Sequence, residues 1–266
     1  MTLRLHVGTA LAAGAELALP DTAARHAQVR RVQPGDALVL FDGAGTEARA
    51  EVLAMGRREV RVLVLDTRAA RAAELPFAVT LAFGMPANER MDALVEKASE
   101  LGAAVLQPLV SARSVLRLDG ERAERRRAHW QAVAVAACEQ CGRSVVPEVA
   151  PVRPLAAWLG AIAARPDDAG AAPRRWLLSP AADAPAWACA AATATTVGAA
   201  TAAAGADAGA DVVLLSGPEG GLDAAECAAA AAAGFAPVSL GPRVLRADTA
   251  PLAALAALAL AALPRR

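Results

Sequence analysis

Short apolar runs alternate with turn residues over about the first 70 positions of the chain. Four of these runs have the length of a β-strand, at residues 17–19, 37–41, 47–53 and 60–65. The segment Gln-Pro-Gly-Asp at 33–36 predicts a turn, and Asp42-Gly43 with Gly45 predicts a hairpin connection. This pattern predicts a small β-rich domain at the start of the chain.

One short helix is expected between these strands, over residues 21–31. It starts with an N-cap candidate, Asp21 or Thr22, and carries four basic side chains in about three turns: Arg25, His26, Arg30 and Arg31. Basic residues on a short helix fit a solvated face as well as contact with a polyanion, and the pattern alone leaves both interpretations open.

After a polar link at residues 67–74 the apolar period changes. Residues 77–83 form a continuous apolar run typical of a buried strand, and Asn88 is expected to cap a helix that Gly102 ends. The apolar residues of that helix recur at steps of three and four: Met91, Leu94, Val95, Ala98 and Leu101. A second strand at 105–110 completes a strand, helix, strand unit, which predicts parallel strands joined by a right-handed crossover.

The rest of the chain repeats this alternation. We expect a long helix at about 121–140, strands at 176–179, 212–216 and 237–240, and helices beginning at Asp223 and at about Asp248. Together these elements predict an α/β domain. Residues 181–210, mostly Ala, Thr and Gly, predict a helix or a mobile insertion that carries no chemistry.

Charge and composition narrow the possible functions. Because 27 Lys and Arg balance 27 Asp and Glu, coating of nucleic acid is not expected, and any RNA contact has to come from a local patch. The apolar stretch at 250–264 is shorter than the roughly 20 residues that cross a bilayer, and no secretory signal opens the chain, so we expect a cytoplasmic protein. Four cysteines are too few for a disulfide framework, and Cys138-x-x-Cys141 has no second pair, so no metal is expected.

The strongest local signal lies at residues 212–226, where a buried strand runs through Gly-Pro-Glu-Gly-Gly into a helix. Asp223 opens that helix, and Glu226 three residues later predicts a capping box. Glycine lets a ligand approach the backbone closely, and such ligands bind at the carboxyl ends of parallel strands. The segment lacks the Lys of a phosphate-binding P-loop, and a tight turn would also need its glycines.

A second loop of this kind follows at residues 240–246. A short strand runs through Gly-Pro into a helix, and the loop adds Arg243 and Arg246. We expect the two loops, on neighbouring strands, to form one pocket. Without an acid/base dyad, a Ser/His/Asp set or a metal cluster, that pocket favours a transfer reaction in which a reactive cofactor is positioned.

Three segments in this order carry a family resemblance: Ala-Cys-Glu-Gln-Cys-Gly-Arg at 137–143, the loop at 217–221, and residues 240–246 followed by Asp248-Thr249. They resemble the RsmE family of 16S ribosomal RNA uridine-N3 methyltransferases, in the SPOUT class. The basic helix, with Leu-Phe-Asp-Gly at 40–43 after it, is similar to the PUA-like domain of that family. The resemblance covers nearly the whole chain.

The resemblance implies an α/β fold with two domains. Residues 1–72 would form a small N-terminal PUA-like β-barrel that binds RNA, and residues 73–266 a SPOUT methyltransferase domain with a deep C-terminal trefoil knot. A homodimer would complete the active site. The implied cofactor is S-adenosyl-L-methionine, held mainly by backbone groups, and no metal is implied.

Site residues follow from the same resemblance. Those expected to bind the cofactor are Ser179, Leu215, Gly217, Pro218, Glu219, Gly220, Leu240, Gly241, Val244, Leu245 and Arg246. Arg246 or Arg143 would stabilise the negative charge that develops on the uracil, while Glu219 or Asp248 would assist proton removal from N3. Asp248 stands where the family usually has Glu, which shortens that carboxylate by one carbon.

The resemblance also implies the partners. Arg25, His26, Arg30 and Arg31 would bind RNA, either 16S ribosomal RNA or the assembled small ribosomal subunit. Two alternatives remain open: a catalytically inactive RNA-binding protein of the same two-domain fold, and a generic nucleotide-binding α/β protein in which both loops are ordinary turns.

Overall fold

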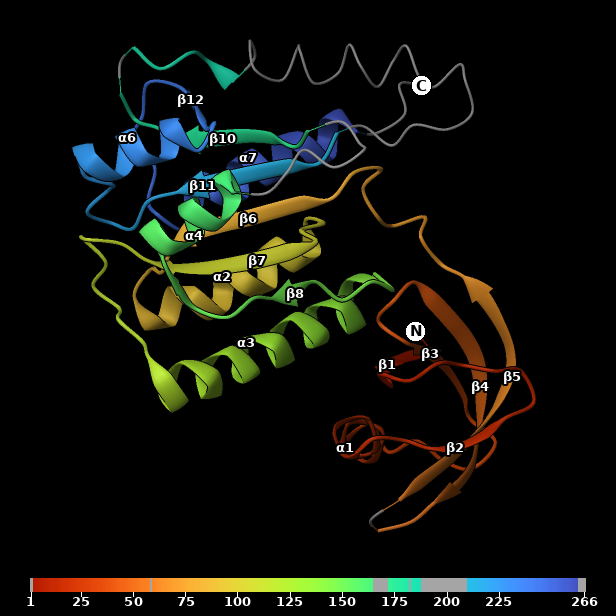
Figure 1. Ribbon diagram of the computed structural model, residues 1–266. Coiled ribbons are helices and arrows are strands. Elements are labelled where there is room, and N and C mark those ends of the chain that lie inside the picture. Colours follow the sequence, from red (N-terminus) through yellow and green to blue (C-terminus); the bar gives the residue numbers. More distant parts are fainter. Residues whose placement is uncertain (1, 58, 165–171, 182, 188–209, 263–266) are drawn as a thin grey trace, which may run out of the picture. The chain divides into compact units, whose positions relative to one another are not determined.

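The computed structural model describes residues 2–57, 59–164, 172–181, 183–187 and 210–262 (Figure 1). Most of the stretch at 181–210 therefore lies outside the described residues. The contacts divide the chain into two compact units, one made of Met1–Glu74 with Val135–Val146 and the other of Leu75–Ala134 with Pro147–Arg266. Within the described part of the chain, no helix is both long enough and apolar enough to cross a membrane.

The first unit is built on a five-stranded sheet. Its strands in spatial order are β1 (Leu3–His6), β3 (Ala37–Phe41), β4 (Thr46–Met55), β5 (Val60–Ala69) and β2 (Glu16–Ala18). Strand β1 pairs with β3 in parallel, and the other pairs are antiparallel. The predicted hairpin at Asp42, Gly43 and Gly45 is confirmed, because β3 pairs with β4 across it.

Helix α1 (Asp21–Val29) covers the core of this sheet with three buried alanines, Ala23, Ala24 and Ala27. The expectation that Asp21 or Thr22 caps the helix is wrong. The N-cap is Pro20, which has no side-chain hydrogen bond to offer, and Asp21 already lies in the first turn, where its charge faces the positive end of the helix dipole. The predicted helix is otherwise confirmed.

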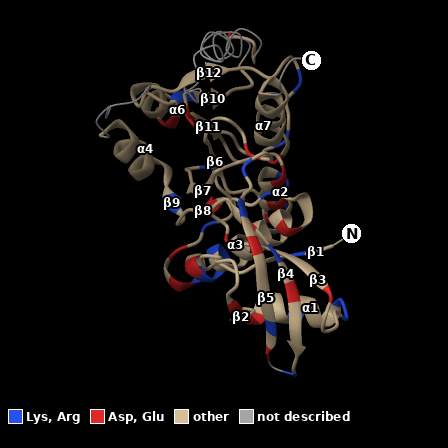
Figure 2. Cartoon of the chain, turned by 90° about the vertical axis from the view of Figure 1, so that its right-hand side faces the viewer, with Lys and Arg blue, Asp and Glu red and all other residues tan. Residues whose placement is uncertain are grey.

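Charged residues of opposite sign alternate along β4 and β5 (Figure 2). On the exposed face Arg49 pairs with Asp66, and Arg61 on β5 pairs with Glu16 on β2. Exposed ion pairs of this kind contribute little to stability. They do neutralise most of the charge on this face of the sheet.

The second unit contains a seven-stranded sheet in which every strand pair is parallel. Along the sheet lie β12 (Ala236–Val238), β10 (Arg174–Leu178), β11 (Val212–Ser216), β6 (Val79–Gly84), β7 (Val105–Val110) and β8 (Glu148–Val149), and β9 (Arg153–Pro154) also pairs with β7. The predicted parallel β-α-β unit is confirmed in β6, α2 (Asn88–Glu100) and β7.

Helices cover both faces of this sheet (Figure 1). One core holds side chains of α2, α3 (Gly120–Cys141) and α7 (Thr249–Ala261), and the other holds those of α4 (Leu155–Ala163) and α6 (Ala224–Ala232). Strand β11 shows why: Val212 and Leu214 enter the first core, while Val213 and Leu215 enter the second. Strand side chains alternate between faces, so a continuous apolar run fits a strand buried on both sides.

Local signals predicted some helix ends and missed others. Asp223 caps α6 and forms a capping box with Glu226, as expected. Asn88, in contrast, is not an N-cap, because that position is Ala87 and Asn88 is the first helical residue. Helix α2 ends at Glu100, and Gly102, which follows the C-cap Leu101, has a φ of +98° that is readily adopted only by glycine.

Candidate functional site

A cavity of about 680 Å³ lies in the second unit at the carboxyl ends of three parallel strands. Its walls come from the segments that follow β10, β11 and β12, together with one side chain from the loop after β7. Strands β11 and β12 are not neighbours as the sequence predicted, since β10 lies between them. Both glycine loops nevertheless line the same cavity, at the edge where open parallel sheets bind ligands.

The first loop is packed so closely that it needs glycine. A Cβ on Gly217 would lie 3.1 Å from the backbone nitrogen of Leu222, and a Cβ on Gly84, at the end of β6, would lie 2.5 Å from Pro218. Real Cβ atoms do not come within 2.5 Å of backbone, so a side chain at Gly84 would displace the loop, while one at Gly217 would push its neighbours by a few tenths of an ångström. Close backbone packing at Gly84, Gly217 and Pro218 thus fixes the path of the loop against the sheet.

Glu219 faces the start of α2 from the tip of this loop. Its Oε1 accepts a hydrogen bond of 3.1 Å from the backbone N–H of Ala87 and lies 3.6 Å from the guanidinium of Arg90. A carboxylate at a helix N-terminus satisfies an unpaired N–H and the helix dipole. These contacts anchor the loop. They also occupy one oxygen of Glu219, one of the two carboxylates that were predicted to assist proton removal.

The second loop follows β12 and contains Gly241 with a φ of +110°, a conformation strained for any other residue. The Oγ of Ser239 bonds both the nitrogen and the carbonyl oxygen of Gly241 at 3.3 Å. Past this turn, Arg243, Val244 and Arg246 are exposed at the cavity.

The structure brings ten of the eleven predicted cofactor residues to this cavity: Ser179, Gly217, Pro218, Glu219, Gly220, Leu240, Gly241, Val244, Leu245 and Arg246. Leu215 is the exception. Its side chain is fully buried in the core that α4 and α6 cover, because it falls on the alternate face of β11. Leu215 therefore does not line the cavity.

Arg143 is also placed elsewhere. It belongs to the first unit, is only 3% exposed, and donates from Nε and Nη2 to Oε2 of Glu74 at 3.0 and 2.6 Å. It is absent from the lining of the cavity. A buried guanidinium engaged in this way ties Glu74 to the segment after α3. The catalytic role of Arg143 stays a prediction.

The sequence missed Arg113, which lies on the loop after β7 and lines the cavity. Its Nη1 donates a hydrogen bond of 3.0 Å to the carbonyl oxygen of Gly220. A signal was present in the sequence, since Arg113 comes three residues after Val110, the last residue of a predicted parallel strand. Ligand-binding residues gather at such strand ends.

Positive charge dominates the mouth of the cavity. Three arginines line it, Arg113, Arg243 and Arg246, against one carboxylate, that of Glu219. In the described part of the chain none of these three arginines forms an ion pair with a carboxylate, whereas Glu219 is already engaged by Arg90. The rim therefore suits a polyanionic substrate.

Asp248, which follows the second loop, has an unusual environment. Its Oδ1 is buried and has no hydrogen-bond partner. The residue occupies the N-cap position of α7, yet its side chain makes no capping hydrogen bond. A buried carboxylate oxygen without a partner is costly unless something else meets it, so Asp248 stays a candidate for contact with a bound molecule.

The basic residues of α1 divide into two kinds. Arg25, Arg30 and Arg31 are exposed, while His26 is half-buried and its Nδ1 lies 3.1 Å from Oε2 of Glu139. Oε1 of the same carboxylate accepts the backbone N–H of His6 at 3.0 Å. The three exposed arginines fit an RNA-binding surface in the first unit. His26 lies beside them and contacts Glu139 near the end of α3.

The cysteines show no metal chemistry in the described residues, where no group of three or more His, Cys, Asp and Glu side chains could hold an ion. Cys138 is buried, and a hydrogen bond with Cys141 together with burial raises the pKa of its thiol well above the usual value. A thiol with a raised pKa is unreactive at neutral pH. Cys227, in contrast, is exposed and lines the cavity.

Comparisons with known proteins identify the family. Residues 73–259 match the RNA methyltransferase domain, and residues 19–65 match the RNA methyltransferase PUA domain. Ribosomal RNA small subunit methyltransferase E of Mycobacterium bovis is 34% identical over 249 residues, which cover 90% of this chain and 87% of that protein. The chain belongs to this family. Its relative of the same name in Bacillus subtilis is 30% identical over 86% of this chain and 84% of its own length.

Solved structures of the family agree with this fold. Ribosomal RNA small subunit methyltransferase E from Neisseria gonorrhoeae, bound to S-adenosyl methionine, superposes with a TM-score of 0.80 and 33% identity over 97% of this chain and 96% of that one. A methyltransferase from Legionella pneumophila in complex with the same cofactor gives a TM-score of 0.82 at 29% identity, with 97% of each chain covered. The predicted family and the α/β fold with a PUA domain are therefore confirmed.

Proposed function

We propose that this protein transfers a methyl group from S-adenosylmethionine to N3 of a uridine in 16S ribosomal RNA of the small subunit. The observation that carries the proposal is the cavity at the ends of β10, β11 and β12, where both glycine loops of the family converge under a rim of three arginines. Two relatives of the same fold are bound to S-adenosyl methionine, which supports the choice of cofactor.

The residues present fit such a cofactor. A volume of about 680 Å³ lies within the range of sites that enclose small ligands, and the loops at Gly217 and Gly241 present backbone groups to it. Ser179, Leu240 and Leu245 complete the walls that would hold the adenosine and methionine parts. When bound, the cofactor would supply an electrophilic methyl group on a sulfonium, and the neutral thioether would leave as a nitrogen nucleophile takes the methyl group.

Arg246 is the residue that we propose for charge stabilisation. Methylation at N3 needs a uracil that has lost its N3 proton, so negative charge spreads to the uracil oxygens as the reaction proceeds. The Arg246 guanidinium, a cation with five N–H donors, lies at the cavity on the loop before α7. It would stabilise that charge without a proton transfer of its own.

Proton removal from N3 has two candidates in the chain. The contacts of Glu219 with Ala87 and Arg90 support a role in holding the loop. The buried, unpartnered Oδ1 of Asp248 supports a carboxylate that meets the substrate or cofactor once these are bound. We therefore propose Glu219 as a positioning residue and Asp248 as the proton acceptor, although Asp248 lies just outside the lining of the cavity.

We further propose that the first unit binds RNA through Arg25, Arg30 and Arg31, with His26 beside them. Support comes from the exposure of these arginines and from the match of residues 19–65 to a PUA domain of RNA methyltransferases. The domain assignment that goes with this proposal is residues 1–72 for RNA binding and residues 73–266 for methyl transfer.

A trefoil knot and a homodimer belong to the same proposal. Support for the knot comes from the path of the chain around β12, where Ser239 donates to Pro185 and accepts from the N–H of Trp187 in backbone hydrogen bonds of 2.8 Å. The segment after β12 thus lies against the segment after β10, which it follows by about 50 residues. Exposed Leu260 on α7 and Val244 at the cavity support a dimer, because large exposed apolar side chains favour burial against a second copy.

The experiment that tests the function is methyl transfer from labelled S-adenosylmethionine to small ribosomal subunits that lack the modification, followed by nucleoside mass spectrometry. We expect 3-methyluridine in the 16S ribosomal RNA. A methyl group at another position would support methyltransferase activity but overturn the assignment to N3. Cofactor and RNA binding without any transfer would instead favour an inactive RNA-binding protein.

A further inference from the structure

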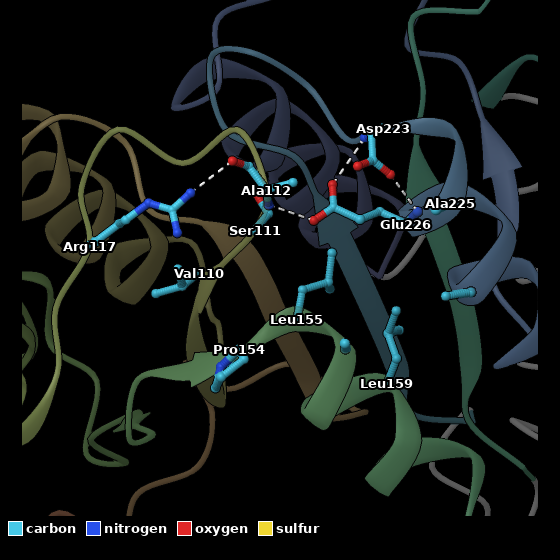
Figure 3. A pocket seen from close by; sticks show the side chains of 12 residues that line it. Val110, Ser111, Ala112, Arg117, Pro154, Leu155, Leu159, Asp223, Ala225 and Glu226 are labelled. Carbon is cyan, nitrogen blue, oxygen red and sulfur yellow. Dashed lines mark hydrogen bonds between the residues drawn. The ribbon is translucent and has the colours of Figure 1, made fainter.

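The loop that follows β7 lies between two cavities of the second unit. On one side Arg113 lines the cavity of the glycine loops. On the other side Ser111 and Ala112 line a separate cavity of about 510 Å³ against α4 and α6, shown in Figure 3. The loop therefore separates the two cavities, and its position determines where the Arg113 side chain lies.

Hydrogen bonds fix the backbone of this loop on both sides of Arg113. The N–H of Ala112 donates to Oε1 of Glu226 at 2.7 Å, and the carbonyl of Ala112 accepts from Nη2 of Arg117 at 2.9 Å (Figure 3). The buried Oγ of Ser114 accepts from the N–H of Ser111 at 2.9 Å. These hydrogen bonds satisfy backbone donors and acceptors of the loop and hold it in place although its tip is exposed.

Glu226 connects this loop to the glycine loop. Its other oxygen, Oε2, accepts the N–H of Asp223 at 3.0 Å, within the capping box that starts α6 (Figure 3). Because α6 begins directly after residues 217–222, one carboxylate positions both loops that meet at the rim of the cavity. Glu226 thus does more than cap a helix.

Arg113 itself reaches across to Gly220. A Cβ on Gly220 would lie 2.9 Å from the Cβ of Arg113, so the two backbones approach as closely as glycine permits. Nη1 bonds the neutral carbonyl of Gly220, and the side chain is exposed. A guanidinium has five N–H donors, so most of the hydrogen-bonding capacity of Arg113 faces solvent at the rim.

We propose that Arg113 binds a phosphate of the RNA next to the nucleotide that enters the cavity, and that Glu226 and Arg117 are the positioning residues that hold it there. This inference rests on the proposed function, which supplies an RNA substrate. A guanidinium matches a phosphate in bidentate geometry, and a rigid backbone limits the entropy lost on binding. A nucleotide placed in the cavity necessarily brings its flanking phosphates to the rim.

The test uses Arg113→Gln and Arg113→Lys, with Arg122→Gln on α3 as a control that removes the same charge from an exposed site away from the cavity. For each protein we would measure S-adenosylmethionine affinity by calorimetry, affinity for unmodified small subunits at several salt concentrations, and kcat and KM. We expect Arg113→Gln to raise KM for the subunit roughly 10-fold and to lower the salt slope by about 1, with a smaller loss of cofactor affinity from the missing hydrogen bond to Gly220.

Two conservative variants sharpen the test. Arg113→Lys should have the salt slope of the wild type, because a lysine keeps the charge. Its KM should lie between those of the wild type and Arg113→Gln, because lysine cannot form a bidentate contact. Glu226→Gln keeps an acceptor for the N–H of Ala112, so it should retain more subunit affinity than Glu226→Ala. Equal effects of the two Glu226 variants would contradict its positioning role.

Other results would overturn the inference. If cofactor affinity falls by the same factor as subunit affinity, Arg113 belongs to the cofactor site and not to the RNA. If neither changes, or if Arg122→Gln has an equal effect, the rim charge is not specific. A wild-type protein that transfers no methyl would refute the proposed function, while the subunit affinities and salt slopes would still decide the role of Arg113.

Discussion

Arg4, Arg68 and Arg143 of the first unit meet carboxylates, whereas the three arginines that line the cavity of the second unit form no ion pair with a carboxylate among the described residues. Glu47, with a side chain only 9% exposed, is held by Arg4 at 2.7 Å and by Arg68, and Arg4 also donates to Ser144 and to the carbonyl of Arg143. At the cavity, Arg113 bonds only the carbonyl of Gly220 among the described contacts. Paired arginines of this kind therefore stabilise the fold, whereas the arginines at the cavity remain available for a polyanion, as do the exposed Arg25, Arg30 and Arg31 of the first unit.

This difference separates structural from functional arginines better than sequence position does. From the sequence, Arg143 and Arg246 were both candidates for catalysis, but in the structure Arg143 is buried against Glu74, whereas Arg246 is exposed at the cavity. An arginine that ends in a buried ion pair cannot leave it without a large cost, whereas an exposed one can exchange water for a ligand.

The largest effect is expected from Glu47→Gln in the first unit. Loss of this carboxylate leaves Arg4 partly buried without its main partner, which should lower the free energy of unfolding by roughly 3 kcal/mol. Denaturant unfolding measures this. Asp66→Asn, which breaks an exposed pair with Arg49, is the control and should change little.

The ion pairs of Glu47 also predict a pH dependence. Burial alone would raise the pKa of Glu47, but hydrogen bonds from Arg4 and Arg68 lower it below its ordinary value of 4.5. A lowered pKa in the folded state stabilises the fold above pH 4.5, and this contribution is lost as the pH falls through the folded pKa. Glu47→Gln should therefore flatten the acid limb of a stability curve, and an unchanged limb would contradict the contribution of Glu47.

In the second unit, Gly217→Ala should reduce kcat/KM roughly 100-fold, because its Cβ would force the backbone at Leu222 and Gly221 to shift and would misplace the bound cofactor. Kinetics and calorimetry with S-adenosylmethionine measure this effect. Gly160→Ala on α4 makes the same substitution where no atom lies within 4 Å of the new Cβ. That control should bind the cofactor normally and gain slight stability, since alanine favours a helix interior.

Substitution of Arg31, which follows α1 with a φ of +56°, should have two smaller and opposite effects, one on stability and one on RNA binding. The N–H groups of Arg31 and Val32 bond the carbonyls of Gln28 and Ala27, the pattern of a helix end that normally carries glycine at this position. Arg31→Gly should stabilise the protein by about 1 kcal/mol while weakening RNA binding. Thermal unfolding and RNA titration measure the two changes.

The matched control is Arg30→Gly, which removes the same charge at a residue with helical backbone angles. It should also weaken RNA binding. It should lower the stability, because glycine at a residue with helical angles relieves no strain and loses more conformational entropy on folding. If Arg31→Gly left RNA affinity intact, the strained arginine would have no role in binding, and the RNA-binding surface on α1 would lose its main support.

The smallest effect is expected from Glu219→Gln. The amide oxygen can still accept the N–H of Ala87, so a positioning residue should change kcat by less than about fivefold and leave its pH profile unshifted. A general base would instead lose most of kcat and the acid limb of the profile. Asp248→Asn, the matched variant, should show that larger loss.

Much of the fold could be predicted because local signals and burial agree. The strands at 37–41, 105–110 and 212–216 match the observed bounds, since apolar runs end there at turn residues. Strand β1 was missed because it contains Arg4, whose carboxylate partner Glu47 lies far along the chain, and His6, whose ring packs against Phe41. Polar residues satisfied by distant partners break the apolar pattern that predicts a strand.

The site was predictable in its loops but not in its contacts. Glycine and capping residues marked both loops, and the alternation of β11 explains why Leu215 faces the core while Ser216 lines the cavity. The role of Arg113 depends on the register of β7 beside β6 and on Gly220, more than 100 residues away. Helix α4 was missed because its N-cap is Pro154, which offers no side-chain hydrogen bond to mark the start of the helix at Leu155.

The most direct test of the cofactor site uses Cys227, an exposed thiol on its wall. Alkylation of the protein with and without saturating S-adenosylhomocysteine, followed by peptide mass spectrometry, reports which cysteines the ligand covers. We predict that the ligand slows alkylation of Cys227 at least tenfold and leaves Cys141, which belongs to the first unit, unchanged. Equal alkylation of Cys227 with and without bound ligand would show that the cofactor lies elsewhere and would contradict the proposed site.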